Sequence, residues 1–73
     1  MREVSIRTEY IALGQLLKLA NFIQTGGEVK FYLMEHSIKV NDEHDNRRGR
    51  KVYVGDIVTV ESEEPFLVTA RPR

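Results

Sequence analysis

The chain has 73 residues, no cysteine, and equal numbers of basic and acidic residues (11 each), so its formal net charge is zero. A content of 41% hydrophobic and 30% charged residues predicts one small folded domain, and a chain of this length buries only about 60% of its unfolded surface. This leaves little interior for a deep substrate pocket, and the missing thiols exclude disulfides and cysteine zinc sites. No apolar run approaches the roughly 20 residues that cross a bilayer, and residues 1–5 carry no apolar signal core, so we expect a cytoplasmic protein without a membrane anchor.

Alternation at residues 3–7 predicts a short N-terminal strand with Val4 and Ile6 on its buried face. A first helix follows, because apolar residues recur at i, i+3, i+4 and i+7; this stripe consists of Leu13, Leu16, Leu17 and Ala20. Gly14, Gln15 and Lys18 are expected on the opposite side. The helix should end near Asn21, a residue that tolerates the left-handed conformation of a helix cap.

A second helix is predicted over residues 26–35. Thr25 and Glu28 have the spacing of a capping box, in which each side chain satisfies a backbone N–H of the other residue. Val29, Tyr32, Leu33 and His36 then repeat the helical stripe. Two helices joined by about four residues should pack as a hairpin or corner.

After Ser37 the apolar period changes from 3.6 to 2, which predicts strands at residues 38–40, 52–54, 57–60 and 66–68. Asn41-Asp42 is typical of a turn, and residues 43–50 are expected to form a polar loop. Residues 71–73 are expected to be a frayed tail. The predicted fold is a single α+β domain over residues 1–73, with a short N-terminal strand and a two-helix hairpin or corner packed on a small, mostly antiparallel sheet.

The strongest charge feature is a run of four cations without an acid in residues 46–51: Arg47, Arg48, Arg50 and Lys51. Acids flank it at residues 42–45 and recur at residues 61–64, so the neutral total hides an uneven layout. Arginine grips phosphate with a bidentate fork, which favours a nucleic-acid backbone as partner. The alternative is a solvated hairpin loop whose cations pair with the neighbouring acids.

Two lysines and a glycine pair also favour anion binding. Lys18 and Lys30 are expected near the corner between the helices, and Gly26-Gly27 would let a phosphate backbone approach the second helix closely. A plain tight turn is the alternative for the glycines, and Glu28 would compete with a phosphate there.

No residue pattern supports catalysis, a cofactor or a metal site. His36 and His44 lack zinc-ligand spacing, no serine sits in a nucleophile elbow, and the carboxylates lie in solvent-facing turns. Phe22 and Phe31 could stack on an unpaired base, although packing against the core is the commoner role of such residues.

The order of five short motifs resembles the S-four RNA-binding domain, named after small-subunit ribosomal protein four. These motifs are Leu13-Gly14-Gln15-Leu16-Leu17-Lys18, Leu33-Met34-Glu35-His36-Ser37-Ile38-Lys39-Val40-Asn41, Arg47-Arg48-Gly49, Val54-Gly55-Asp56-Ile57-Val58 and, linking the helices, Gln24-Thr25-Gly26-Gly27-Glu28-Val29-Lys30. The last of these, with residues 46–51, is most similar to the small stand-alone bacterial members of the YaaA type. The resemblance covers residues 13–60.

The resemblance implies a helix-and-hairpin surface that docks on structured RNA, with ribosomal RNA and ribosome assembly as the expected setting. By position, the implied binding residues are Lys18, Gln24, Thr25, Gly26, Gly27, Lys30, Lys39, Arg47, Arg48, Arg50 and Lys51. Two departures stand out. Thr25-Gly26-Gly27 replaces the Ser-Arg that many members carry, and Asn41-Asp42 replaces an Asn-Gly turn, so we expect a loop longer than a two-residue type I′ turn.

Together these observations predict a non-catalytic, monomeric RNA-binding module without cofactor, metal or small-molecule substrate. The alternative is a protein-interaction module that docks a basic partner through its sheet edge or its acidic residues 61–64.

Overall fold

The computed structural model describes residues 1–72. Within that range the elements are β1 (Arg2–Ile6), β2 (Tyr10–Ala12), α1 (Leu13–Leu19), the 3-10 helix η1 (Gly26–Glu28), α2 (Val29–Glu35), β3 (Ile38–Val40), β4 (Glu43–His44), β5 (Lys51–Tyr53), β6 (Ile57–Val60) and β7 (Phe66–Ala70). None of the helices formed by residues 1–72 has the length and apolar character needed to cross a membrane.

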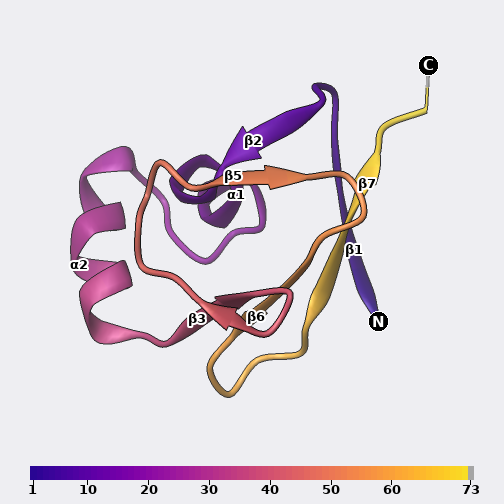
Figure 1. Ribbon diagram of the computed structural model, residues 1–73. Helices are drawn as coiled ribbons and strands as arrows, with labels where there is room; N and C mark the ends of the chain where they lie inside the picture. The colour runs from indigo at the N-terminus through magenta and orange to yellow at the C-terminus, as the bar shows by residue number, and fades with distance from the viewer. Residues whose placement is uncertain (73) are drawn as a thin grey trace.

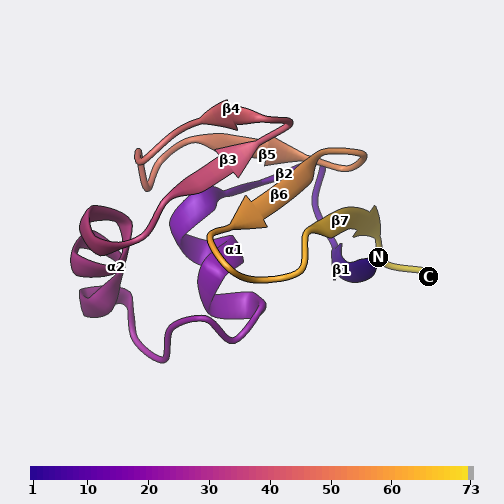
Figure 2. The same cartoon turned by 90° about the horizontal axis from the view of Figure 1, so that it is seen from below.

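The strands form two sheets (Figure 1). Five strands pair in the order β1-β7-β6-β3-β4, and β2 pairs with β5 in a separate antiparallel ribbon. Only the β1–β7 pair of the described chain is parallel, with Val4 opposite Val68. Both helices lie on one side of the strands, with α1 directly beneath them and α2 at one end (Figure 2). The predicted α+β fold, with two helices against a mostly antiparallel sheet, is confirmed.

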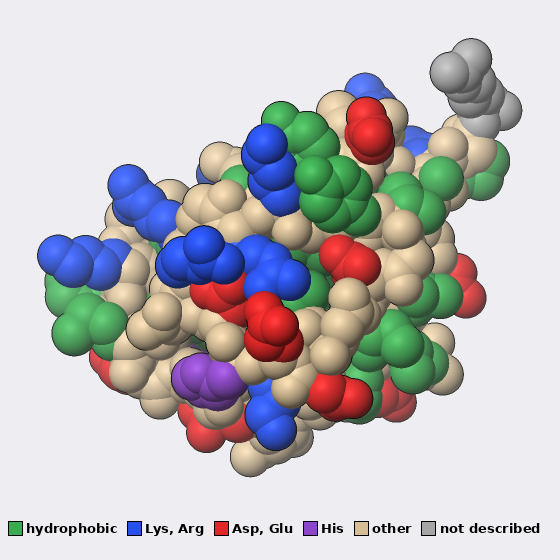
Figure 3. Space-filling view, viewed as in Figure 1, with side chains coloured by type: hydrophobic (Ala, Val, Ile, Leu, Met, Phe, Trp, Pro, Cys, Tyr) green, Lys and Arg blue, Asp and Glu red, His purple; other side chains and the backbone are tan. Residues whose placement is uncertain are grey.

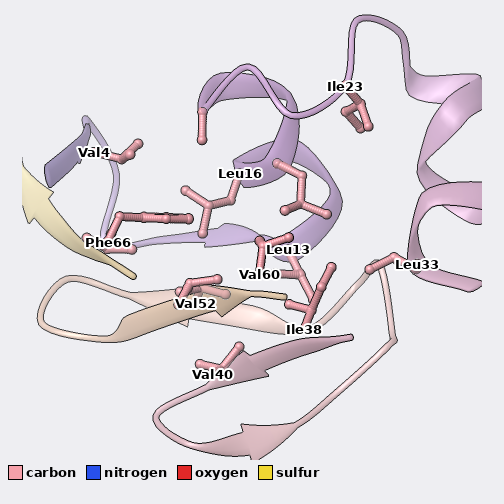
Figure 4. Packing of buried hydrophobic residues seen from close by; sticks show 14 of the residues in the cluster. Val4, Leu13, Leu16, Ile23, Leu33, Ile38, Val40, Val52, Val60 and Phe66 are labelled. Atoms are coloured by element: carbon pink, nitrogen blue, oxygen red, sulfur yellow. The ribbon is translucent and has the colours of Figure 1, made fainter. Parts of the chain in front are cut away.

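The core lies between α1 and the strands. Leu13, Leu16 and Leu17 are completely buried, and they meet inward-facing residues of several strands, among them Val52 and Phe66 (Figure 4). This is the helical stripe read from the sequence. Each aliphatic side chain buried in this way contributes about 1.5–3 kcal/mol relative to an exposed one. Because the leucines of α1 share one core with residues of both sheets, α1 joins the two sheets.

The first helix differs from its prediction at one residue that matters for the site. Gly14 was expected on the outer side, and this was wrong, because it is buried against Val29 and Arg48. A Cβ on Gly14 would lie 3.0 Å from Val29 Cγ1 and 3.3 Å from Arg48 Cβ, so glycine allows the close approach. The helix ends at Leu19, and Asn21 has the expected left-handed backbone (φ 68°).

The second helix begins as a 3-10 turn. The predicted capping box is present, since Glu28 Oε1 accepts hydrogen bonds from both the backbone N–H and the hydroxyl of Thr25, each at 3.2 Å. Regular α-helix starts only at Val29. Of the predicted apolar stripe, Val29 and Leu33 are buried, whereas Tyr32 and His36 are partly exposed.

The hairpin after β3 is tighter than predicted. Asn41 and Asp42 both have positive φ (52° and 66°), and Val40 pairs directly with Glu43, which defines a two-residue turn of type I′ character. The expected longer loop was therefore wrong. Asn41 explains the difference, because its side chain donates to Asp56 Oδ1 (3.0 Å) and accepts from the Ile57 N–H (2.9 Å). Residues 43 and 44, which were predicted to begin the polar loop, instead form the short strand β4.

Two other segments complete the comparison with the sequence. Strand β2 was not anticipated, because three residues paired with a distant β5 leave too short a pattern to recognise. Of the predicted frayed tail, residues 71 and 72 are exposed without regular structure, and Arg73 lies outside the described residues.

Candidate nucleic-acid interface

The basic loop, residues 45–51, is organised around one buried acid. Asp45 is only 7% exposed, and its backbone N–H donates to the carbonyl of Ile38 (3.0 Å). Its Oδ1 accepts from the backbone N–H and the Nε of Arg47 (2.9 and 3.1 Å), while its Oδ2 accepts from Arg47 Nη2 and Arg50 Nη1 (2.8 Å each). The carboxylate thus holds two guanidinium groups in defined orientations.

These contacts shift the protonation of the acid. Hydrogen bonds from Arg47, with a further bond from Arg50, hold the pKa of the Asp45 carboxyl well below its usual range, against the opposing effect of its burial. Asp45 is therefore ionised throughout the neutral range, and the two ion pairs persist there.

The loop backbone is fixed to the start of α1. The N–H groups of Leu13 and Gly14 donate to the carbonyls of Arg50 and Arg48 at 2.8 and 2.9 Å. The first N–H groups of a helix have no partner inside the helix, and Ala12 at its N-cap provides no side-chain bond. The loop thus caps α1, and the helix in turn fixes the position of the loop.

The charge pairing splits the predicted cation cluster in two. Arg47 and Arg50 are bound to Asp45, and Arg50 also reaches Glu43 (3.3 Å), as the solvated-loop alternative supposed. Arg48 and Lys51 form no salt bridge with any acid in residues 1–72. Arg47 nevertheless keeps 71% of its side chain exposed, so one edge of its guanidinium remains open to solvent.

Three adjoining hollows run along this side of the molecule. One is lined by Arg47, Gly49, Arg50, Lys51 and Tyr53, together with Asn41 and Asp56. A second lies between α1, η1 and the loop, and shares Gly49 with the first and Arg48 with the third. The third is lined by Lys30, Leu33, Met34, Asn46 and Arg48. Figure 3 shows Lys and Arg side chains gathered across this face, around β5 and toward α2, with acids interspersed.

The structure brings together only part of the predicted site. Gly26, Lys30, Arg47, Arg48, Arg50 and Lys51 line the connected hollows. Lys18 is exposed one turn along α1 from Gln15, which lines the middle hollow. Lys39 is exposed on β3, and Gln24, Thr25 and Gly27 are exposed between the helices without lining any of the three hollows.

Two residues at this face were not recognised in the sequence. Asp45 was counted among flanking acids, although its place directly before Asn46 and two arginines is a signal for a carboxylate that organises the loop. Tyr53 follows Lys51 at i+2, so the alternation in β5 already placed its ring beside that cation.

The acidic residues 61–64 present fewer free carboxylates than their sequence suggests. Glu61 binds His36 Nδ1 (2.9 Å), and Glu64 Oε1 accepts from the backbone N–H of Arg2 (3.1 Å). They lie in the connection from β6 to β7, on the opposite side of Figure 1 from β5. No group of three or more potential metal ligands occurs in the described part of the chain.

Comparison with known proteins adds two findings. A family model described as the S4 domain matches residues 4–69. The chain is also 60% identical over 65 residues to a protein of Bacillus subtilis (strain 168) named "Probable ribosome maturation protein RlbA", a match that covers 89% of this chain and 92% of the relative.

Proposed function

Since the chain belongs to the S4 domain family, we propose that it is a non-catalytic RNA-binding protein whose basic loop grips the phosphate backbone of structured RNA. The central contacts are assigned to Lys30, Arg47, Arg48, Arg50 and Lys51. The marginal contacts are Lys18, Gln24, Thr25, Gly26, Gly27 and Lys39.

The observation that carries the proposal is the fixed geometry of the loop. Flexible cations lose side-chain freedom when they bind, at about 0.5–1.5 kcal/mol for each side chain that becomes immobile. Asp45 and the start of α1 have already ordered Arg47 and Arg50 in the free protein. A duplex of RNA offers regularly spaced phosphates rather than accessible base edges, and a small rigid surface is suited to read that spacing.

The number of cations left unpaired inside the protein sets the expected salt dependence of RNA binding. Of the five central cations, Arg47 and Arg50 are paired with Asp45 or Glu43, which leaves three without a salt bridge among the described residues: Lys30, Arg48 and Lys51. Neutralising about three phosphates predicts that log affinity falls with log salt with a slope of about −3.

The relative's name further supports a setting in ribosome maturation. We therefore assign ribosomal RNA or a ribosomal particle as the partner of this chain. In cells that lack the protein, immature ribosomal particles should accumulate on a sucrose gradient, and the tagged protein should sediment with a subunit at low salt. A normal gradient, and a protein that stays at the top of it, would contradict this assignment.

The binding proposal is tested with a labelled RNA hairpin of about 20 base pairs, by fluorescence anisotropy from 50 to 300 mM KCl. The double variant Lys30→Ala with Arg48→Ala removes two cations that have no internal acid partner among the described residues. It should weaken binding at low salt by more than tenfold and reduce the salt slope by about two.

A matched control removes the same charge elsewhere. Arg7 and Arg71 line a hollow formed by β1 and the chain after β7, away from the basic loop. Arg7→Ala with Arg71→Ala should leave the slope unchanged and lower affinity less than threefold. Equal losses in both double variants would mean that only net charge matters, and the proposed interface would be wrong.

A further inference from the structure

Two exposed tyrosines form an aromatic pair on the β2–β5 ribbon. Tyr10 and Tyr53 are direct cross-strand partners, their ring centroids are 5.5 Å apart, and the rings are tilted by 47°. They keep 42% and 43% of their surface exposed, while the neighbouring Val52, which pairs with Ile11, is fully buried in the core. A ribbon of two strands thus presents a broad aromatic surface to solvent.

This pair is continuous with the basic loop. Lys51 lies two residues before Tyr53, so both side chains project from the same face of β5. The Lys51 ammonium is 4.9 Å from the centre of the Tyr10 ring, a cation–π contact that occupies Tyr10. Tyr53, in contrast, lines the hollow that contains Arg47 and Arg50. Its ring is the one next to groups that can hold a phosphate.

We propose that Tyr53, supported by Tyr10, stacks on an unpaired RNA base adjacent to the phosphates held by the basic loop. The proposal rests on the function proposed above and adds the kind of RNA that binds best, a helix interrupted by an unpaired nucleotide. Bases inside a duplex already stack on their neighbours, whereas an unpaired base exposes both faces and loses water when it meets an aromatic ring.

The surroundings of the other exposed aromatic ring favour this assignment. Phe31 is 62% exposed on α2, but it lines a hollow with Glu28 and Glu35. A nucleotide that stacked there would bring its phosphate toward two carboxylates. Phe31 therefore serves as an internal control, an exposed aromatic ring in a hollow that no lysine or arginine lines.

The test compares two hairpins of identical stem sequence, one fully paired and one with a single bulged adenosine, at 100 mM KCl, and the salt slope of each complex is measured from 50 to 300 mM KCl. Stacking on one base predicts that the protein binds the bulged hairpin about 5- to 100-fold more tightly. Tyr53→Thr should abolish this preference and leave affinity for the paired hairpin within twofold. Tyr53→Phe should retain the preference, and Phe31→Ala should not alter it. Threonine suits an exposed strand position, and Tyr53→Leu provides a second ring-free variant if Tyr53→Thr does not fold.

The outcomes separate the two proposals. Loss of the preference in the ring-free variants, with an unchanged salt slope, supports stacking by Tyr53. A wild-type protein that binds both hairpins equally overturns the stacking assignment and leaves the phosphate-binding function standing. A protein that binds neither hairpin at low salt overturns the proposed function itself. A preference that Tyr53→Phe also loses would refute ring stacking.

Discussion

Replacing Asp45 with asparagine separates the amount of charge in the basic loop from its orientation. Asparagine keeps the size of the side chain and an oxygen that can accept from the Arg47 N–H, but it loses the negative charge that binds two guanidinium groups. A hydrogen bond to a charged group contributes about 1.5–3 kcal/mol, against about 0.5–1.5 for a neutral one. The loss of stability should come mostly from the bond to Arg50, because the Arg50 side chain is only 22% exposed. In the variant, water can replace the contacts of the exposed Arg47 side chain, so their loss should cost little.

We therefore expect the variant to lose about 1–2 kcal/mol of unfolding free energy at pH 7. For a domain of this size that lowers the melting temperature by about 5–15 °C, measurable by circular dichroism. The loss should depend on pH. Because the folded pKa of Asp45 is depressed, its contribution to stability is complete above the unfolded value near 4, shrinks below that value, and is lost only as the pH falls through the depressed folded pKa. The stability difference between wild type and variant should therefore narrow steadily as the pH falls below about 4.

The RNA affinity of the same variant should change in the direction opposite to the one that net charge alone predicts. Removing an acid raises the net charge by one, which alone would tighten binding to RNA. If the orientation of Arg47 and Arg50 matters more, the freed side chains must be ordered on binding, and affinity should fall about 5- to 10-fold at 100 mM KCl. Tighter binding by Asp45→Asn, with an intact fold, would refute the role assigned to this buried carboxylate.

Three further substitutions test how the elements around the site are held, each by thermal and urea unfolding. Gly14→Ala should destabilise by about 1–2 kcal/mol despite its better helix propensity, because its Cβ would meet Val29 and Arg48; a variant as stable as wild type would show that the loop can move aside. Asp42→Gly should stabilise by about 0.5–1 kcal/mol, since glycine accepts positive φ without strain, and any loss of stability would contradict the type I′ assignment. Thr25→Ala should cost about 0.5–2 kcal/mol through loss of its cap contacts, whereas no change would mean that the capping box adds nothing.

The parts of the fold that could be predicted depend on contacts close in sequence. The apolar stripe of α1, the capping box at Thr25, and the change to period 2 after Ser37 are all set within a few residues, and the structure contains each of them. The family assignment also followed from the order of short motifs, and the family match over residues 4–69 confirms it.

The features that the sequence did not reveal depend on contacts between distant residues. Gly14 looked solvent-facing, because helical periodicity contains no information about a loop more than 30 residues later that covers it. Likewise, Asn41 and Asp42 adopt positive φ since Asn41 is anchored by Asp56 and Ile57 at the start of β6, the strand that pairs with β3. The site was predictable as a set of cations, but not as a geometry.

A buried acid inside a basic loop also explains how a chain with zero net charge can suit a polyanion. The Asp45 carboxylate is shielded from solvent by the chain around it, so it acts mainly on the two arginines it holds, while the outer edge of Arg47 is open to solvent and the Arg48 side chain is exposed. On the far side, Glu61 and Glu64 are engaged by His36 and Arg2. Two acids of the far side are thus engaged in internal contacts, while Lys30, Arg48 and Lys51 of the basic face form no salt bridge among the described residues. Net charge averages over both ends, whereas a phosphate backbone within a Debye length of about 8 Å responds only to the nearer one.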